Sequence, residues 1–255
     1  MHRLAVQRAY DSMHEDTRSA FMDLSSSCDG IGRGKTPRGI YDTNAFRLGD
    51  ADRTGGLFLT IARMNHSCRP NVNHYWSSSL QMTLVFASRD IAAGEELRTT
   101  YGPSEWLNTK GRREFLCERF AFDCNCEMCV EGNDLGGDKR MEAIRSLQEA
   151  IALSSSLVVD GGALSSKWGG DSTVAALESV ERCLALMNEQ GIDGGAFTKS
   201  IYHRGYAICD AAGDDAGARS YLVSELRAVR DSEGVYSPNA MEIERVLNRG
   251  VCQAG

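Results

Sequence analysis

The stretch RMNHSCRPN, residues 63–71, decides how the fold is interpreted, because it sets an amide, an imidazole, a hydroxyl and a thiol side by side. One explanation is a polar turn, in which the asparagines bond to nearby backbone groups and the proline fixes the exit. Another is the site of a hydrolase, with Cys68 or Ser67 as nucleophile and His66 as its base. The sequence disfavours the nucleophile, because adjacent residues seldom have that geometry and no G-x-S-x-G elbow surrounds them.

The composition bounds the class of protein. The chain has 255 residues, 42% of them hydrophobic, which suffices for one large domain or two modest ones. No window approaches the roughly 18 unbroken apolar residues of a membrane-spanning helix. The first residues, MHRLAVQRAYDSMHEDTR, are too charged for the apolar core of a signal peptide. We therefore expect an intracellular protein, in the nucleus or the cytoplasm, without a membrane partner.

The acidic charge is concentrated in the second half of the chain. Residues 1–129 hold 16 basic and 16 acidic side chains, whereas residues 130–255 hold 12 and 19. No basic stripe is available to displace phosphate counterions, so we expect no direct binding of nucleic acid. An acidic solvated face explains the excess, and a basic protein partner would match it.

The apolar pattern changes near residue 130. Before it, VNHYW (72–76) and LQMTLVFA (80–87) alternate as strands do, with a short serine connection between them, and a third short strand is expected around Leu97 and Thr99. Residues 108–120 have helical spacing. The first half therefore predicts a small β-rich domain within an α+β chain.

The second half predicts five helices. Their apolar faces are Met141, Ile144, Leu147 and Ile151; Val174, Leu177, Val180, Leu184 and Met187; Ile201 and Ile208; Tyr221, Leu222, Leu226 and Val229; and Met241, Val246 and Leu247. Glycine-bearing breaks separate several of them, which suggests a repeat-like antiparallel bundle. The segment EGNDLGGDKR (131–140) is the expected boundary between the halves.

Three clustered cysteines predict a metal site. Cys124-x-Cys126-x-x-Cys129 has the close spacing that lets a few turn residues present thiolates to one ion. A disulfide across either short spacing would be strained. A tetrahedral structural site needs a fourth ligand, and spacing alone does not choose it. The candidates are His66, Cys68, His74 and Cys117.

A third cluster, FASRDIAAGEELRTTYG (86–102), ends a predicted strand pair with a tyrosine. The succession of RMNHSCRPN, this segment, a helix and FDCNCEMC, with TNAF (43–46) ahead, resembles the SET-domain protein lysine methyltransferases. The likeness is to the branch that includes the MYND-containing enzymes and many fungal relatives, and it covers about residues 40–130. Residues 131–255 resemble, in pattern only, the tetratricopeptide-like (TPR-like) helical domain that follows there.

The resemblance implies S-adenosylmethionine as methyl donor. Carried over residue by residue, Asn65 and His66 contact the donor, and Tyr101 is the active-site tyrosine, close to both the transferred methyl group and the lysine nitrogen. Phe122 covers the adenine of the donor, and Asn44 of TNAF is a further donor-contacting asparagine. Without the resemblance, Phe122 and Asn44 would be ordinary core and turn residues.

The resemblance also implies zinc, held by Cys68 together with Cys124, Cys126 and Cys129. The stretch around residue 65 is then crowded because it joins the donor site to the metal. Family members thread this segment beneath a neighbouring one in a knot-like arrangement, which is rare among folds.

The front of the chain departs from the family pattern. We interpret GIGRGKT (30–36) as a loop and residues 4–27 as the helical insert between the two halves of a SET domain. On this interpretation the chain starts inside the domain, without its first strands and without a MYND zinc finger. The expected divisions are 1–40, helical insert and loop; 41–103, C-terminal part of the SET domain; 104–130, post-SET zinc-binding segment; and 131–255, TPR-like helical domain.

Three hypotheses about function follow. The first is methyl transfer from S-adenosylmethionine to a lysine side-chain amine of a histone or another protein. The second is a catalytically inactive, truncated SET-like protein that acts as a zinc-supported protein-interaction module. The third is an unrelated zinc-stabilised helical adaptor. The sequence identifies neither the substrate lysine nor the oligomeric state.

Overall fold

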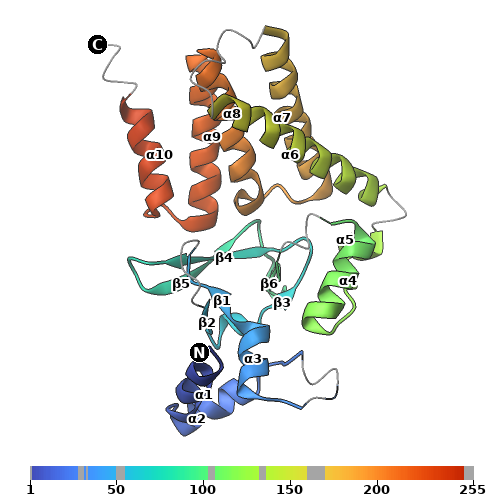
Figure 1. Ribbon diagram of the computed structural model, residues 1–255, viewed down its shortest axis with the longest axis vertical. Helices are drawn as coiled ribbons and strands as arrows, with labels where there is room; N and C mark the ends of the chain where they lie inside the picture. Colours follow the sequence, from blue (N-terminus) through green and yellow to red (C-terminus); the bar gives the residue numbers. More distant parts are fainter. Residues whose placement is uncertain are drawn as a thin grey trace. The chain divides into compact units, whose positions relative to one another are not determined.

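The computed structural model describes residues 2–27, 32, 34–49, 55–102, 107–131, 136–159 and 170–249 (Figure 1). The chain divides into two compact units. The first comprises Met1–Pro70, Trp76–Leu84 and Glu96–Val130, and the second comprises Asn71–Tyr75, Val85–Glu95 and Glu131–Gly255. The predicted loop at 30–36 and the predicted boundary at 131–140 lie partly outside the described residues, and their described parts include no strand.

Three helices open the first unit: α1 (His2–Asp11), α2 (Glu15–Met22) and α3 (Pro37–Asn44). The first two confirm the helices predicted for residues 4–27. The third was not predicted, although Thr36 caps it by accepting a hydrogen bond from the Gly39 backbone N–H at 3.0 Å and Pro37 starts it. Phe21 of α2, Leu24 and Ile40 of α3 form a buried core, and Tyr10 of α1 packs against it. Because α3 ends at Asn44, the first two residues of the TNAF motif belong to the last turn of this helix.

Three two-stranded sheets follow. Their strands are β1 (Phe46–Arg47) with β2 (Gly55–Gly56), β3 (Asn65–His66) with β6 (Arg98–Thr99), and β4 (Val72–Ser77) with β5 (Met82–Ala87). A 3₁₀ turn, η2 (Ile61–Arg63), precedes β3. The predicted hairpin is confirmed as β4 and β5, with its connection at residues 78–81. The described residues of the first half are less β-rich than the sequence predicted, since four of their six strands are two residues long.

The β3–β6 pair joins the two motifs on which the site depends. The strands run parallel, with Asn65 opposite Arg98 and His66 opposite Thr99. The Ser67 backbone N–H continues the ladder by donating to the Thr99 carbonyl at 2.9 Å. The pairing sets the segment at 65–68 beside the segment that leads to Tyr101.

Two helices complete the first unit, α4 (Thr109–Phe120) and α5 (Glu127–Glu131). The Asn108 side chain caps α4 by accepting from the Gly111 backbone N–H at 2.9 Å. The helix ends at Ala121, which has a left-handed φ of 60°. The helix predicted over 108–120 is confirmed. Of the three clustered cysteines, Cys124 and Cys126 lie in the turn between α4 and α5, and Cys129 lies in α5.

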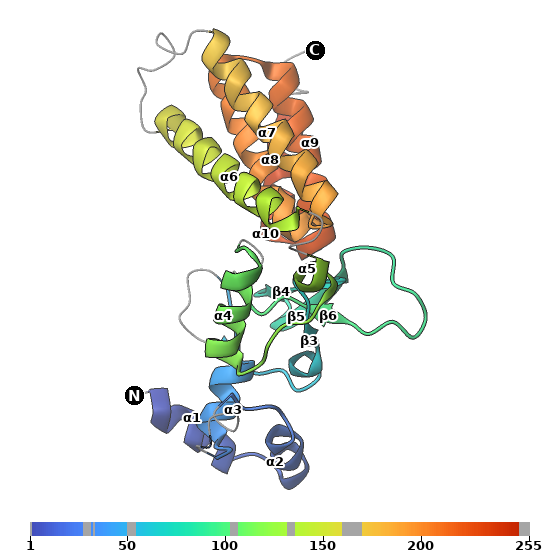
Figure 2. The same ribbon diagram turned by 90° about the vertical axis from the view of Figure 1, so that its right-hand side faces the viewer.

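The second unit contains the five predicted helices, α6 (Gly137–Val159), α7 (Gly170–Gln190), α8 (Gly195–Ala212), α9 (Asp215–Glu233) and α10 (Pro238–Arg249). The long helices α7, α8 and α9 lie side by side in both views, α6 packs on α7 and α8, and α10 packs on α9 (Figures 1 and 2). The predicted faces are largely buried. Val174 and Met241 are exceptions, 55% and 51% exposed, because a periodic pattern does not tell which helix ends lack a neighbour. In the described part of the chain, no helix is both long and apolar enough to cross a membrane.

Candidate active site and metal centre

The four cysteines named from the sequence converge in the structure. The sulfur atoms of Cys68, Cys124, Cys126 and Cys129 all lie within 4.8 Å of one another, and all four side chains are buried. Cys68 comes from the segment after β3, Cys124 and Cys126 come from the turn between α4 and α5, and Cys129 comes from α5. Two parts of the chain that are distant in sequence therefore present a complete set of four thiols.

The geometry of this cluster fits a tetrahedral metal and not a disulfide. The sulfurs of Cys68 and Cys129 are 3.7 Å apart. Zinc–sulfur bonds of about 2.3 Å in a tetrahedron separate the sulfurs by about 3.8 Å, whereas a disulfide needs about 2.05 Å. Four thiolates with no open position are typical of a structural zinc site.

The thiols shift one another's pKa values in opposite directions. Hydrogen bonds to Cys124, Cys126 and Cys129 raise the pKa of Cys68 far above its ordinary range. Hydrogen bonds from Cys124, Cys129 and Cys68 lower the pKa of Cys126 far below it. The cluster by itself therefore favours mixed protonation, and a divalent cation would allow all four sulfurs to ionise, because thiolates are the ligand form.

His66 connects the cluster to the predicted active-site tyrosine. Its Nδ1 accepts a hydrogen bond from the Tyr101 backbone N–H at 3.1 Å, so the ring proton resides on Nε2, which lies 3.3 Å from the Cys68 sulfur and donates to it. Burial lowers the pKa of His66 to about 4. The charge of Cys126 opposes this shift, and the positive charge of Arg112 adds to it. The imidazole is therefore neutral at neutral pH, with a tautomer fixed by its two partners.

Tyr101 lies in an aromatic group. Its ring centroid is 5.0 Å from that of Phe120, 5.3 Å from that of His66 and 6.1 Å from that of Phe122. Its hydroxyl donates to the Met64 carbonyl at 2.8 Å, which fixes the O–H direction and leaves the oxygen lone pairs available to accept. Burial, and then the negative charge of Glu96, raise the pKa of Tyr101, so the phenol stays protonated.

The two predicted donor-binding asparagines stand in different surroundings. Asn65 is exposed on β3, and its amide donates to Glu96 at 2.6 Å. Asn44 ends α3, and its amide donates to the carbonyls of Ser25 and Ile40, both at 2.7 Å. The described hydrogen bonds thus connect His66, Tyr101 and the cysteines directly, while those of Asn44 stay within residues 25–44.

Two polar residues of this region were missed by the sequence interpretation. Arg112 is fully buried in α4, and its Nε donates to the Cys129 sulfur at 3.4 Å. A signal existed in the sequence, because Arg112 and the buried Leu116 are four residues apart on one helical face. Glu96 had no comparable signal, since its contact with Asn65 depends on the pairing of β3 with β6.

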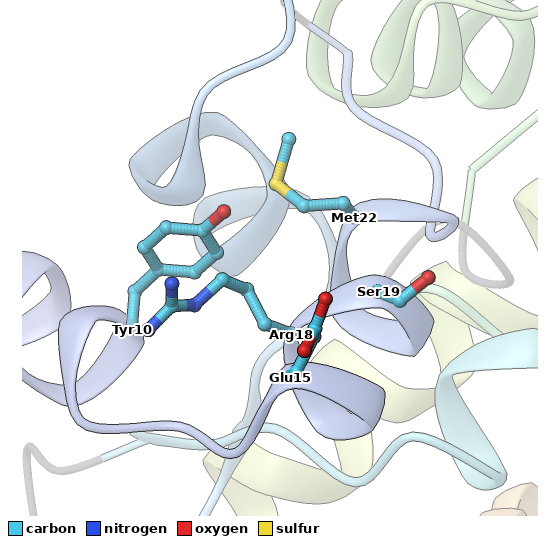
Figure 3. A pocket seen from close by; sticks show the side chains of 5 residues that line it. All are labelled: Tyr10, Glu15, Arg18, Ser19 and Met22. Carbon is cyan, nitrogen blue, oxygen red and sulfur yellow. The ribbon is translucent and has the colours of Figure 1, made fainter.

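A pocket of about 500 Å³ lies elsewhere in the first unit, on α1 and α2 (Figure 3). It is lined by Tyr10, Glu15, Arg18, Ser19 and Met22. The Arg18 guanidinium lies over the Tyr10 ring at 5.2 Å from its centroid. None of its lining residues was predicted as a site residue, and none belongs to the group formed by His66, Tyr101 and the cysteines.

Comparison with known proteins finds similarity to one family in the first part of the chain. The family model of the SET domain matches residues 6–102. The chain is 43% identical over 91 residues to "Histone-lysine N-methyltransferase set5" of Schizosaccharomyces pombe, a match that covers 36% of this chain and 28% of that protein.

Two further relatives come from animals. "SET domain-containing protein SmydA-8, isoform A" of Drosophila melanogaster is 37% identical over 103 residues, which cover 38% of this chain and 22% of that protein. "Protein-lysine N-methyltransferase SMYD4" of Mus musculus is 35% identical over 75 residues, which cover 29% of this chain and 9% of that protein. The chain thus matches less than a third of each of these three relatives.

Proposed function

We propose, from the SET domain of the lysine methyltransferase family that this chain carries, that the protein transfers a methyl group from S-adenosylmethionine to the side-chain amine of a lysine in a protein substrate. The observation that carries the proposal is the hydrogen-bonded path from Tyr101 through His66 to Cys68. This path joins the proposed catalytic tyrosine to the proposed zinc site through one neutral imidazole.

The rate of this reaction depends mainly on how the methyl donor and the lysine amine are oriented. S-adenosylmethionine, when bound, would supply a methyl group on a positive sulfur: the N–C bond to the neutral amine would form as the C–S bond breaks in line, with the uncharged thioether as leaving group and the positive charge passing to the methylated amine. The residues of this chain therefore act by holding the amine in line and by excluding water, and not by acid–base chemistry. Tyr101 is the proposed catalytic residue, because its hydroxyl hydrogen is engaged by the Met64 carbonyl and its oxygen remains able to accept from the amine.

The substrate lysine must be neutral to react. Its unperturbed pKa is about 10.4, and a desolvated channel favours the neutral amine. The rings of Phe120, Phe122 and Tyr101 supply such an apolar surrounding. The raised pKa of Tyr101 keeps the phenol uncharged, so that it does not hold the lysine as a cation.

The proposed donor site comprises Asn44, Asn65, His66, Tyr101 and Phe122. The ring centroids of Phe122 and His66 are 5.9 Å apart and the rings are tilted by 55°, so we assign the cover of the adenine to the Phe122 ring alone. The proposed zinc site comprises Cys68, Cys124, Cys126 and Cys129. Zinc, when bound there, supplies a structural cross-link and leaves no open position for chemistry.

The substrate we propose is a lysine-bearing protein such as a histone. The name of the Schizosaccharomyces pombe relative refers to histones, and that of the mouse relative refers to proteins in general. The acidic excess of residues 130–255 favours a basic partner. We further propose that these residues form a TPR-like domain which contributes to binding the substrate.

A second candidate function is a catalytically inactive module that binds proteins through its zinc-supported surface. One observation favours it: the amides of both Asn44 and Asn65 are engaged by groups of this chain. A methyl donor would have to compete with these bonds.

The test is a calorimetric titration of S-adenosylmethionine into the full chain after bound zinc has been confirmed. We expect binding near one equivalent, lost in Asn65→Ala and kept in Asn73→Ala. Asn73 is a matched control, because its amide also makes one described side-chain hydrogen bond, to the Ser232 carbonyl at 2.8 Å. No binding by the folded, zinc-loaded protein would overturn the enzymatic proposal and favour the interaction module.

A further inference from the structure

The side chain of Arg112 is completely buried, which is unusual for a charged group. Its guanidinium makes four hydrogen bonds. Nε donates to the Cys129 sulfur at 3.4 Å, Nη1 to the Leu107 carbonyl at 2.6 Å, and Nη2 to the Thr109 hydroxyl at 2.8 Å and the Met128 carbonyl at 3.2 Å. These bonds fasten the start of α4 to Met128 and Cys129 of α5, next to the turn that carries Cys124 and Cys126.

No carboxylate neutralises this cation within the described ranges of the chain, where the ion pairs all involve other residues. Two of its partners are backbone carbonyls and one is a hydroxyl. Burying a guanidinium without a counter-charge costs several kcal/mol. The sulfur of Cys129 is the partner that can carry a full negative charge, so the charge of Arg112 is balanced when the cysteines are thiolates.

We propose that Arg112 is a positioning residue of the zinc site, one that supplies the buried positive charge on which a four-thiolate site depends. The inference rests on the proposed function through its zinc site. Four thiolates around one divalent ion leave two net negative charges in the interior. The guanidinium offsets one of them and donates directly to a ligand sulfur, an arrangement that fixes the orientation of a ligand and strengthens metal binding.

The adjacent arginine has a different environment. The side chain of Arg113 is 41% exposed, and it pairs with Asp123 at 3.4 Å and donates to the Cys124 carbonyl at 3.1 Å. It therefore has a carboxylate partner, access to water and no described bond to a sulfur. Arg113→Gln removes one positive charge from the same turn of α4 and serves as a matched control for Arg112→Gln.

The experiment compares Arg112→Gln, Arg112→Lys and Arg113→Gln with the unaltered full chain. Zinc affinity is measured by competition with a chromophoric chelator, and unfolding by urea is followed for the zinc-loaded and the zinc-stripped forms. We expect Arg112→Gln to raise the zinc dissociation constant by about 10- to 100-fold. Arg112→Lys should lie in between, since an ammonium keeps the charge but not the planar set of donors. Arg113→Gln should change the constant by less than about twofold.

Two outcomes would overturn the inference. If Arg112→Gln leaves the zinc affinity unchanged and destabilises the zinc-loaded and zinc-stripped forms equally, Arg112 only holds the backbone of residues 107–128 together. If the unaltered chain binds no zinc, the zinc part of the proposed function fails and the inference fails with it. If Arg112→Gln does not fold, the zinc affinity of Arg112→Lys tests the inference instead. An unchanged zinc affinity in Arg112→Lys would contradict a role for the guanidinium bond to Cys129.

Discussion

The backbone N–H of Tyr101 donates to Nδ1 of His66 across 3.1 Å, although the two residues are 35 positions apart. The bond fixes the tautomer of the ring, so that the opposite nitrogen can donate to the Cys68 sulfur. The backbone at Tyr101 is thereby tied to the cysteine cluster, and a disturbance of the cluster should reach the tyrosine.

Replacement of the tyrosine tests its catalytic role. Tyr101→Phe keeps the ring among Phe120, Phe122 and His66 and loses the hydroxyl bond to the Met64 carbonyl. We expect a loss of unfolding free energy of about 1 kcal/mol and a fall in methyl transfer of about 10- to 100-fold. Tritium transfer from labelled S-adenosylmethionine to a histone mixture measures the rate.

Tyr41→Phe is the control for this change. The Tyr41 hydroxyl also donates to a backbone carbonyl at 2.8 Å, that of Gly55, and lies outside the aromatic group of Tyr101. It should lose a similar amount of stability while the transfer rate stays near that of the unaltered protein. Full activity of Tyr101→Phe would remove its hydroxyl from the mechanism.

Removal of a proposed zinc ligand should loosen a defined segment. Cys126→Ser is expected to release the zinc and to increase hydrogen exchange over residues 107–131, because formation of the site and folding of the segment are coupled. Elemental analysis of the purified protein measures the metal. Cys117→Ser makes the same chemical change at an exposed thiol of α4 and should keep the zinc. An undiminished metal content in Cys126→Ser would contradict the assignment of the ligand.

The pair of His203 and Glu225 predicts a dependence of stability on pH. The Nδ1–H of His203 donates to the Glu225 carboxylate at 3.1 Å, and this hydrogen bond raises the pKa of His203 above its ordinary 6.5. A histidine whose pKa is raised on folding contributes stability that is complete below the unfolded pKa and is lost as the pH rises through the folded pKa. The midpoint of urea unfolding should therefore fall from about pH 6 to about pH 8. His203→Gln should flatten this slope, and an equal slope in both proteins would assign it to other groups.

The packing of α8 on α9 depends on a glycine. A Cβ atom at Gly205 would lie 2.6 Å from the Tyr221 ring. Alanine is ordinarily favoured over glycine inside a helix by about 1 kcal/mol, yet we expect Gly205→Ala to lower the unfolding free energy by about 1–3 kcal/mol. Urea unfolding measures the change. Combining it with Tyr221→Ala should remove most of the cost, and additive effects of the two substitutions would rule out the clash.

Much of the fold was predictable because it is encoded locally. The hairpin of β4 and β5 follows from alternation, α4 from its spacing and the Asn108 cap, and the five C-terminal helices from their apolar faces. The start of α3 also had a local signal, Thr36 before Pro37, but the poor helix formers that follow concealed it.

The candidate site was predictable only in part. Spacing indicated three cysteines and left four candidates for the fourth ligand, and the resemblance to a family selected Cys68. The structure places the Cys68 sulfur with the other three, His66 beside it and Cys117 exposed. The burial of Arg112 could not be read from α4 alone, since it depends on the contacts of that helix with Met128 and Cys129.

Cys68 and Cys129 are 61 residues apart, so an ion held by both closes a long loop of the chain. By the relation used for covalent cross-links, closing a loop of that length removes conformational entropy worth on the order of 4 kcal/mol from the unfolded ensemble. The pairing of β3 with β6 involves two residues of each strand, so by itself it offsets little of the entropy lost when these distant segments come together. Metal supply would then determine not only how stable the first unit is, but also when its distant segments meet during folding.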